Sequence, residues 1–459
     1  MYQIDFRHPI HVYFVGIGGI SMSGLAEVLL EAGFTVSGSD KQESALTKAL
    51  EDKGVRIFYG QRKSNITPDI DCAVFTSAIH PDNPEYAAVK ELSIPSLSRA
   101  ELLGQMMKNY GMSVAVSGTH GKTTTTAMIS EILLHADLDP TLSIGGILKS
   151  IGGNIRVGKS EYFVTEACEY TNSFLSLFPK TGIILNIEED HLDFFQDLAD
   201  IRRSFRRFAE LIPSDGTLII NGEIPNLSEF TDGLCCRIVT FGFSTECDYH
   251  PLNITSTENG GTSFTLCCPD GRSSDFTLCV PGEHNVCNAL AALALADSLA
   301  IPGETAKRAL ESFHGTNRRF EYKGCIGGVT IIDDYAHHPT EITATLKAAA
   351  SYPHKTVWCV FQPHTYSRTK AFMKDFAKAL SLADKVVLAD IYASRETDTL
   401  GISSKNLLEE LTSLGCECYY FPSFDEIENF LLQNCINGDL LITMGAGDIV
   451  KVGEKLLGM

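Results

Sequence analysis

Short apolar runs alternate with amphipathic stretches along the 459 residues of the chain. A short apolar run, followed by a glycine or polar turn and then a helical pattern, predicts a βα unit with a buried strand. Such units build parallel sheets covered by helices, so we predict the α/β class. The clearest helices are expected at 22–31 and 123–135. The predicted strands are 11–15, 34–38, 56–59, 72–77, 113–116, 162–165, 183–187, 330–332, 356–361, 385–389 and 440–443.

One stretch departs from this pattern. From about 236 to 280, short alternating segments are separated by turns at 259–261 and 269–271, which predicts a small antiparallel insertion. Hinges are expected at 110–111 and 314–317. We therefore predict three domains, which span 1–108, 109–314 and 315–459.

Composition narrows the class of protein. Hydrophobic residues make up 44% of the chain, as in ordinary globular proteins. The formal charge of -20 disfavours contact with a phosphate backbone, so we expect no nucleic acid partner. The 14 cysteines form no Cys-x-x-Cys pair, which favours free thiols in a reducing compartment. The longest apolar block, 289–296, is too short to span a bilayer, and residues 1–9 lack a signal-peptide core. We expect a cytoplasmic protein without membrane insertion.

The first glycine turn nearly fits a dinucleotide-binding fingerprint. Gly16, Gly18 and Gly19 follow the first strand, and Asp40 lies 22 residues after Gly18, where a ribose-binding acid would stand. Ser21 replaces the third glycine of that fingerprint. A pyrophosphate at the start of the next helix fits the turn, whichever nucleotide carries it. NAD, a nucleotide sugar and a tight turn without a ligand remain open.

The second glycine turn is more specific. It lies between a buried strand and a helix, and its backbone N–H groups can cradle phosphates. A lysine there reaches the β- and γ-phosphates, and the following hydroxyl can bind Mg²⁺. Val116 stands where a strict P-loop has glycine, so this loop is a shorter variant. The predicted ATP-binding residues are Gly118, Thr119, His120, Gly121, Lys122, Thr123 and Thr124.

Two acidic clusters, 166–169 and 186–191, follow later strands of the same domain. Carboxylates at the carboxyl ends of parallel strands converge on the ligand crevice, and Mg²⁺ prefers oxygen ligands. These acids therefore either bind Mg²⁺ or are solvated loop acids.

Polar groups also open helices farther along the chain. Asn285 and Asn288 start an apolar helix, where Asn285 could be a ligand contact or an N-terminal cap. The segments 333–339 and 361–368 follow strands of the third domain. The pair His337 and His338 could bind a metal, but the proline after it favours a structured substrate loop.

Taken together, these segments resemble the Mur ligases. The resemblance is spread in order over nearly the whole chain, in 16–26, 118–124, 186–193, 282–288, 318–321, 333–341, 361–369 and 445–448. It implies a Rossmann-like N-terminal domain for a UDP sugar, a central ATPase domain and a Rossmann-like C-terminal domain for an amino acid. The implied reaction uses ATP and Mg²⁺. It activates the lactyl carboxylate of UDP-N-acetylmuramate as an acyl phosphate, which the amine of L-alanine attacks.

The resemblance also assigns roles to residues. Lys122, Glu166 and His191 are implied as catalytic, and Thr123, Glu166 and His191 as metal ligands. The further residues implied for the UDP sugar are Gly16, Gly18, Gly19, Ser21, Asp40 and Ser77; those for ATP are Asn285, Asn288 and Arg318 or Arg319, with Arg319 preferred. Those for the amino acid are Tyr335, His337, His364 and Arg368.

Two features depart from the family. Thr365 stands where many members have arginine, so recognition of the carboxylate would rest more on Arg368. No lysine lies between Lys180 and Glu246, so we expect no carbamylated lysine near the metals.

Three alternatives remain. A ligase that reattaches a recycled tripeptide to the same UDP sugar would share every phosphate motif. An NAD-dependent oxidoreductase would leave the loop around Lys122 unexplained. A non-catalytic, nucleotide-gated binding protein would not need Glu166, His191 and Arg368 together.

Overall fold

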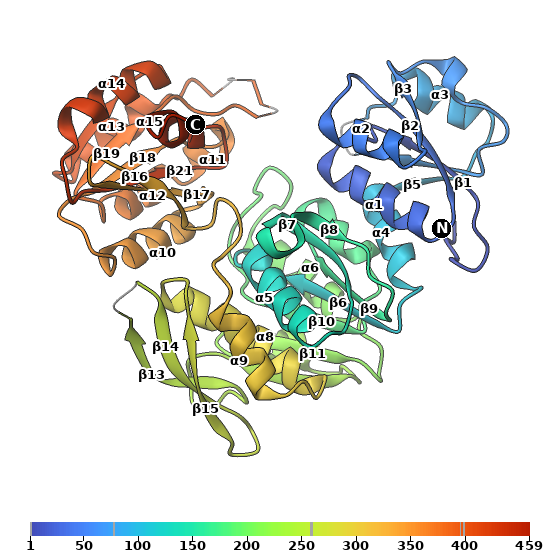
Figure 1. Ribbon diagram of the computed structural model, residues 1–459, viewed down its shortest axis with the longest axis horizontal. Coiled ribbons are helices and arrows are strands. Elements are labelled where there is room, and N and C mark those ends of the chain that lie inside the picture. Colours follow the sequence, from blue (N-terminus) through green and yellow to red (C-terminus); the bar gives the residue numbers. More distant parts are fainter. Residues whose placement is uncertain (1, 77–78, 258–259, 395, 398–399) are drawn as a thin grey trace. The chain divides into compact units, whose positions relative to one another are not determined.

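The computed structural model describes residues 2–76, 79–257, 260–394, 396–397 and 400–459 (Figure 1). The chain divides into two compact units, each with its own internal packing. One unit comprises Met1–Lys122, Leu133–Glu188 and Ala199–Val239, and the other Thr123–Ile132, Glu189–Leu198 and Thr240–Met459. The predicted three-domain boundaries stay a prediction.

The first sheet is entirely parallel, as its buried apolar strands predict. Its strands stand in the order β3-β2-β1-β4-β5, so the glycine turn follows the central strand. The bounds are β1 His11–Val15, β2 Thr35–Asp40, β3 Arg56–Tyr59, β4 Cys72–Phe75 and β5 Ser96–Ser98. The helices of this region are α1 Ile20–Glu31, α2 Ala45–Asp52, η1 Lys63–Asn65, α3 Pro84–Glu91 and α4 Arg99–Met107. The predicted site residue Ser77 lies outside the described residues.

The second sheet has the order β12-β11-β10-β6-β9-β7-β8. Its central pairs are parallel, and β7 and β8 at one edge are antiparallel. The strands are β6 Met112–Ser117, β7 Thr141–Leu148, β8 Gly153–Arg156, β9 Tyr162–Glu166, β10 Thr181–Ile184, β11 Thr217–Asn221 and β12 Arg237–Phe241. The helices are α5 Lys122–His135, η2 Lys149–Ile151, η3 Tyr170–Ser176, α6 Leu198–Ala209 and α7 Ser228–Thr231. The strand predicted at 183–187 ends at Ile184, which leaves Asn186 in the loop that follows.

The predicted antiparallel insertion is confirmed as a three-stranded sheet, β13-β14-β15. Its strands are β13 His250–Ser256, β14 Thr262–Cys267 and β15 Ser273–Leu278. The expected start near 236 is wrong, because β12 belongs to the seven-stranded sheet. After the insertion come α8 Glu283–Ser298 and α9 Gly303–Glu311.

The fourth sheet has the order β16-β17-β21-β18-β19-β20, with β16 antiparallel to β17 and the other pairs parallel. Successive strand residues point to opposite faces: Cys359 belongs to the core that holds α10, α12 and α13, and Val360 to the core that holds α14 and α15. The strands are β16 Glu321–Ile326, β17 Val329–Asp334, β18 Val357–Phe361, β19 Lys385–Leu388, β20 Glu417–Tyr420 and β21 Leu440–Met444. The helices are α10 Pro339–Ala350, α11 Tyr366–Ala371, α12 Met373–Leu380, α13 Ser404–Ser413, α14 Phe424–Asn434 and α15 Val450–Leu456.

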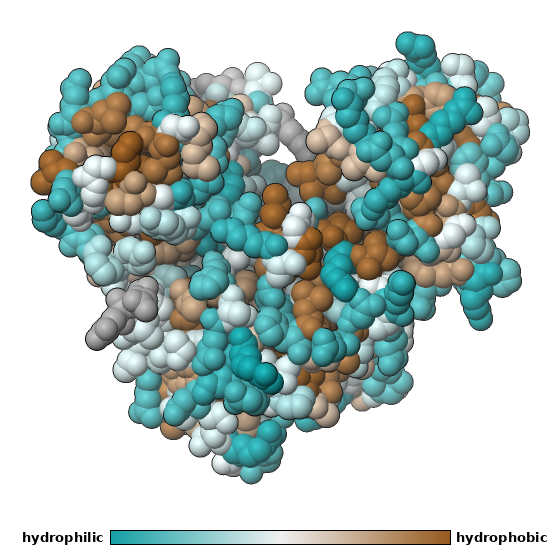
Figure 2. All heavy atoms as spheres, viewed as in Figure 1, coloured by the Kyte–Doolittle hydropathy of each residue, from teal (hydrophilic) through white to brown (hydrophobic). Residues whose placement is uncertain are grey.

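The predicted α/β class is therefore confirmed. On the face drawn in Figure 2, hydrophilic residues alternate with several patches of hydrophobic residues. Among the described residues, no helix has both the length and the apolar character needed to cross a membrane.

Gly38 provides a test of how the first glycine turn is packed. A Cβ atom at Gly38 in β2 would stand 2.5 Å from the carbonyl oxygen of Phe14 and 3.0 Å from the Cβ of Ile17 in the turn. Because a backbone atom cannot move aside cheaply, Gly38→Ala should destabilise the protein by about 1–3 kcal/mol, measured as a lower midpoint of denaturant unfolding. Gly303→Ala is the control, since a Cβ there meets no described atom within 4 Å. It should be neutral or stabilising by about 0.4–1 kcal/mol; equal losses in the two variants would contradict this account of Gly38.

Candidate functional site

The first glycine turn is held by the carboxylate of Asp40. The backbone N–H of Gly18 donates to Asp40 Oδ2 at 2.8 Å, and a Cβ at Gly18 would stand 2.8 Å from the same oxygen. Gly16 has a φ of +86°, which glycine adopts without strain. Gly19 caps α1 without a side chain, and Ser21 Oγ accepts a hydrogen bond from Arg99. Asp40 thus braces the turn, a role that the fingerprint did not predict for it.

The second glycine turn is fastened to the end of β10. Asn186 accepts the N–H of His120 at 2.8 Å and donates to the His120 carbonyl at 3.0 Å. The hydroxyl of Thr119 accepts the N–H of Glu188 at 2.9 Å. Gly118 and Gly121 have φ values of +144° and +85°, in the region that favours glycine. The loop is therefore pre-shaped by its own unit.

Lys122 opens α5, one residue before the predicted helix start, and its ammonium group lies inside the loop. The Nζ atom donates to the carbonyl oxygens of Gly118 and Thr119. It also donates to both carboxylate oxygens of Glu169, at 3.1 and 2.9 Å. Burial alone would lower the pKa of Lys122, but the charge of Glu169 outweighs it and the pKa is raised. The lysine is therefore a fixed cation at physiological pH.

Glu169 is the residue whose role the sequence did not predict. Its place in the cluster 166–169 predicts a metal ligand or a solvated loop acid, but it is 2% exposed and pairs with Lys122. Glu166, at the end of β9, accepts the N–H of Gly145. The two acids of one cluster thus differ in their surroundings, because Glu169 follows the strand end by three residues.

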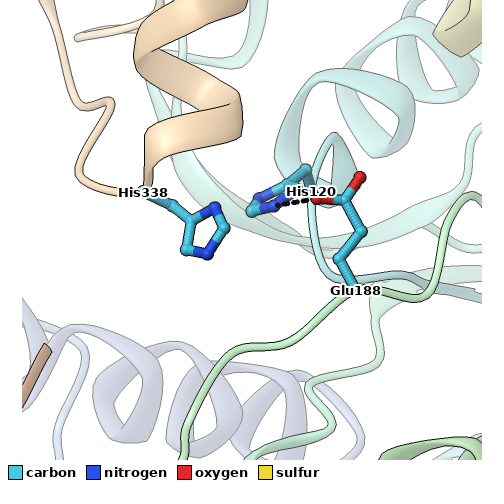
Figure 3. Close-up of side chains that lie close together, drawn as sticks. All are labelled: His120, Glu188 and His338. Atoms are coloured by element: carbon cyan, nitrogen blue, oxygen red, sulfur yellow. Dashed lines mark ion pairs between the residues drawn. The ribbon is translucent and has the colours of Figure 1, made fainter. Parts of the chain in front are cut away.

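His120 and Glu188 face each other across the same loop (Figure 3). His120 Nε2 lies 3.6 Å from Glu188 Oε2, which makes an ion pair when the imidazole is protonated. Thr123 is buried and Thr124 half-buried in the first turn of α5. The structure thus brings the predicted phosphate-loop residues 118–122 together within one unit.

Glu166 and His191 belong to different units of the chain. His191 has a φ of +52°, and its backbone N–H donates to Asp190 Oδ1 at 2.7 Å. The second carboxylate oxygen of Asp190 stands 3.7 Å from His191 Nε2. The predicted metal set of Thr123, Glu166 and His191 stays a prediction.

The four residues predicted for the amino acid lie together. The ring of His337 is 5.4 Å from that of Tyr335 and 5.7 Å from that of His364, centroid to centroid. Arg368 Nη1 stands 3.1 Å from His364 Nδ1. Burial lowers the pKa of His337 and of His364 to about 4, so both imidazoles are neutral at pH 7.

Tyr392 extends this cluster, and the sequence did not single it out. Its ring stacks on that of His364 at 5.8 Å, and its backbone N–H donates to the Pro363 carbonyl. A Cβ at Gly447 would stand 2.8 Å from the Tyr392 ring. No local pattern marks Tyr392, because the fold brings it from the segment after β19.

His338, which Figure 3 also labels, is the N-cap residue before α10. Its Nδ1 accepts the N–H of Thr340 at 3.3 Å, and its Nε2 lies 3.1 Å from the carbonyl oxygen of Glu189. Because Nδ1 is an acceptor, the proton belongs on Nε2, which donates to Glu189. His338 is thus a helix cap, and this favours the structured substrate loop over the paired-histidine metal site.

Arg318 and Arg319 differ in how they are held. Arg318 donates to Asp333, at 2.8 Å, and to the carbonyl oxygens of Gly445 and Gly447. Arg319 forms a longer ion pair, with 3.8 Å between its Nη1 and Glu341 Oε1. Arg318 therefore ties β17 to the loop after β21, whereas Arg319 is held by the longer ion pair, and its contact with ATP stays a prediction.

Asn285 is the third residue of α8 and not its cap. Gly282 occupies the cap position, so the capping alternative is wrong. The Asn285 amide donates to the Pro281 carbonyl at 2.8 Å and accepts from Asn288 Nδ2 at 3.2 Å. Both amides are buried and ordered at one helix start.

Comparisons with known proteins cover the whole chain. Residues 11–111 match the family described as Mur ligase family, catalytic domain, residues 116–296 the Mur ligase middle domain, and residues 318–447 the Mur ligase, glutamate ligase domain. A protein of Agathobacter rectalis named UDP-N-acetylmuramate--L-alanine ligase is 60% identical over 457 residues, covering 100% of both chains. A protein of the same name from Lachnoclostridium phytofermentans is 55% identical over 468 residues, again covering 100% of both.

Comparisons with solved structures also find ligases. The crystal structure of UDP-N-acetylmuramate-alanine ligase MurC from Thermotoga maritima matches with a TM-score of 0.80 and 31% identity over 98% of each chain. A murein peptide ligase from Psychrobacter arcticus matches with a TM-score of 0.70 and 26% identity over 98% of each chain.

The Lys122–Glu169 pair generates a prediction about stability. The side chains are 16% and 3% exposed, and breaking a buried pair leaves an uncompensated charge. Glu169→Gln should therefore cost about 3–5 kcal/mol, measured from the midpoint of denaturant unfolding. Glu210→Gln is the control, because the Arg206–Glu210 pair in α6 has 27% and 50% exposed side chains and should be worth less than about 1 kcal/mol. Similar shifts in both variants would show that Glu169 is not a buried counter-charge.

Proposed function

The chain belongs to the Mur ligase family, and we propose that it joins L-alanine to the lactyl carboxylate of UDP-N-acetylmuramate with the use of ATP. The observation that carries the proposal is the 60% identity, over the full length of both chains, to a protein named for that reaction. The ordered phosphate loop around Lys122 supports it from the structure. The enzyme would work in the cytoplasm, where peptidoglycan precursors are assembled.

In the proposed reaction a carboxylate oxygen of the sugar attacks the γ-phosphorus of ATP, and ADP leaves. The acyl phosphate is needed because a carboxylate is a poor electrophile. The amine of L-alanine then attacks the carbonyl carbon, loses a proton, and phosphate departs as the amide forms. The assigned domains are 1–108 for the UDP sugar, 109–314 for ATP and 315–459 for the amino acid.

On the phosphate side, Lys122 carries the main role. Its ammonium stabilises the charge on the transferring phosphoryl group, and Glu169 keeps it protonated and in place. Thr123, Glu166 and His191 would hold Mg²⁺, and the hydroxyl and carboxylate among them suit an oxygen-seeking cation. When bound, Mg²⁺ neutralises phosphate charge. Gly16, Gly18, Gly19, Ser21, Asp40 and Ser77 would serve the UDP sugar, and Asn285, Asn288 and Arg319 would serve ATP beside loop residues 118–124.

On the amino-acid side, His337 is proposed to bind the amino group and Arg368 the carboxylate. His337 Nδ1 lies 3.0 Å from the Tyr335 carbonyl oxygen, so Nδ1 carries the proton and Nε2 is left as an acceptor for the amino group. The guanidinium of Arg368 binds the carboxylate of alanine. Tyr335 and His364 would line the same amino-acid site.

The first test of the proposal is substrate-dependent phosphate release. Release should require ATP, UDP-N-acetylmuramate and L-alanine together, because the electrophile and the amine come from separate substrates. L-Serine, glycine and a cell-wall tripeptide are assayed in parallel with L-alanine. Full activity with the tripeptide and none with L-alanine would instead assign the recycling reaction.

A pair of substitutions separates the two halves of the site. Arg368→Ala should raise the alanine KM about tenfold to 150-fold, because a charged hydrogen-bonded pair is worth about 1.5–3 kcal/mol. It should change the KM of ATP and of the UDP sugar little. Lys122→Ala should abolish turnover, since its charge acts during phosphoryl transfer. Steady-state titrations of each substrate measure the KM values and the turnover of both variants. An unchanged alanine KM in Arg368→Ala would refute the assignment of Arg368 to the amino acid.

A further inference from the structure

Asp190 joins two parts of the proposed site that are far apart in the sequence. It lies in the loop after β10, next to His191, and its side chain pairs with Arg368, 178 residues later. Asp190 Oδ1 accepts Arg368 Nη2 at 2.9 Å and Nε at 3.3 Å. The two side chains are 9% and 10% exposed, so water screens the pair little.

The contact leaves part of the Arg368 guanidinium available. Of its five N–H groups, Nε–H and one on Nη2 are directed at Asp190, and one on Nη1 at His364 Nδ1. The two that remain, one on each terminal nitrogen, have no partner in the described part of the chain. A carboxylate bound by these two would receive two hydrogen bonds.

Asp190 is itself anchored. The backbone N–H of His191 donates to the same Oδ1 at 2.7 Å, and His191 is in the left-handed region with a φ of +52°. A carboxylate held by backbone cannot swing away readily to make room for a ligand. Its departure would also leave a buried charge without its partner, which is costly.

We propose that Asp190 is a positioning residue: it fixes the plane of the Arg368 guanidinium so that the two free N–H groups face the carboxylate of the incoming amino acid. The inference rests on the proposed ligase function and adds to it a residue that touches no substrate. The alternative is that Asp190 competes with the amino acid for Arg368. The two differ in sign, because removing a competitor would tighten amino-acid binding and removing a positioning residue would weaken it.

The test is a double-substitution cycle in the full-length enzyme, with phosphate release measured against L-alanine concentration. Asp190→Ala should raise the alanine KM about tenfold or more, the range expected for a lost charge-assisted hydrogen bond. Asp190→Asn, which keeps an acceptor oxygen but not the charge, should fall between Asp190→Ala and the wild type. In the Arg368→Ala background, Asp190→Ala should change the alanine KM no further. The KM of ATP should stay within about threefold in all variants, because neither side chain is assigned to ATP and a tenfold change would need about 1.4 kcal/mol.

Glu417→Gln is the matched control, because Glu417 pairs with Lys385 at 2.9 Å in the same unit, on strands β19 and β20. It should leave every KM unchanged. An Asp190→Ala enzyme with an unchanged or lower alanine KM would overturn the proposal, as would independent, additive effects in the cycle. If Asp190→Ala does not fold, Asp190→Asn alone decides by the same criterion. A wild-type enzyme without L-alanine-dependent phosphate release would overturn the proposed function, and the inference with it.

Discussion

The buried ion pair of Lys122 and Glu169 is the interaction on which the proposed phosphate site depends. A lysine in a loop at a sheet edge would normally extend into water, but here both oxygens of Glu169 and two loop carbonyls hold it inward. The same loop is fixed at its next residue by Asn186, whose side chain binds the backbone N–H and carbonyl of His120. The ion pair and the loop conformation thus stabilise each other, because Glu169 holds the ammonium group and the ammonium group binds the loop carbonyls.

Polar side chains also hold other loops of the molecule in place. In each parallel sheet the strands end at a common edge, and the loops beyond that edge carry the polar groups. Asp40 braces one glycine turn, and Arg318 ties the end of β17 to the loop after β21. Asp40 is also among the residues proposed for the UDP sugar, whereas Arg318 is held entirely by groups of the fold.

Much of the fold follows from local pattern. The apolar run 113–116 and the helix that starts at Lys122 were predictable because strand burial and helix periodicity are encoded by neighbouring residues. Gly16, Gly118 and Gly121 were also predictable, since a glycine turn after a buried strand is a local pattern and their positive φ values favour glycine. Element ends were predicted less well: β10 stops at Ile184, and β12 joins the larger sheet instead of the insertion. Pairing between distant strands decides such ends, and no local pattern records it.

The sequence by itself determined the α/β class, the two glycine loops and the set of polar residues that could act, because each depends on residue types at short spacing. Only the tertiary structure decided how those residues divide their work. It paired Lys122 with Glu169, assigned Arg318 to the fold and left Arg319 freer, and brought Asp190 to Arg368 across 178 residues. The physical reason is that burial and charge pairing depend on distance in space, which the spacing of residues along the chain does not specify.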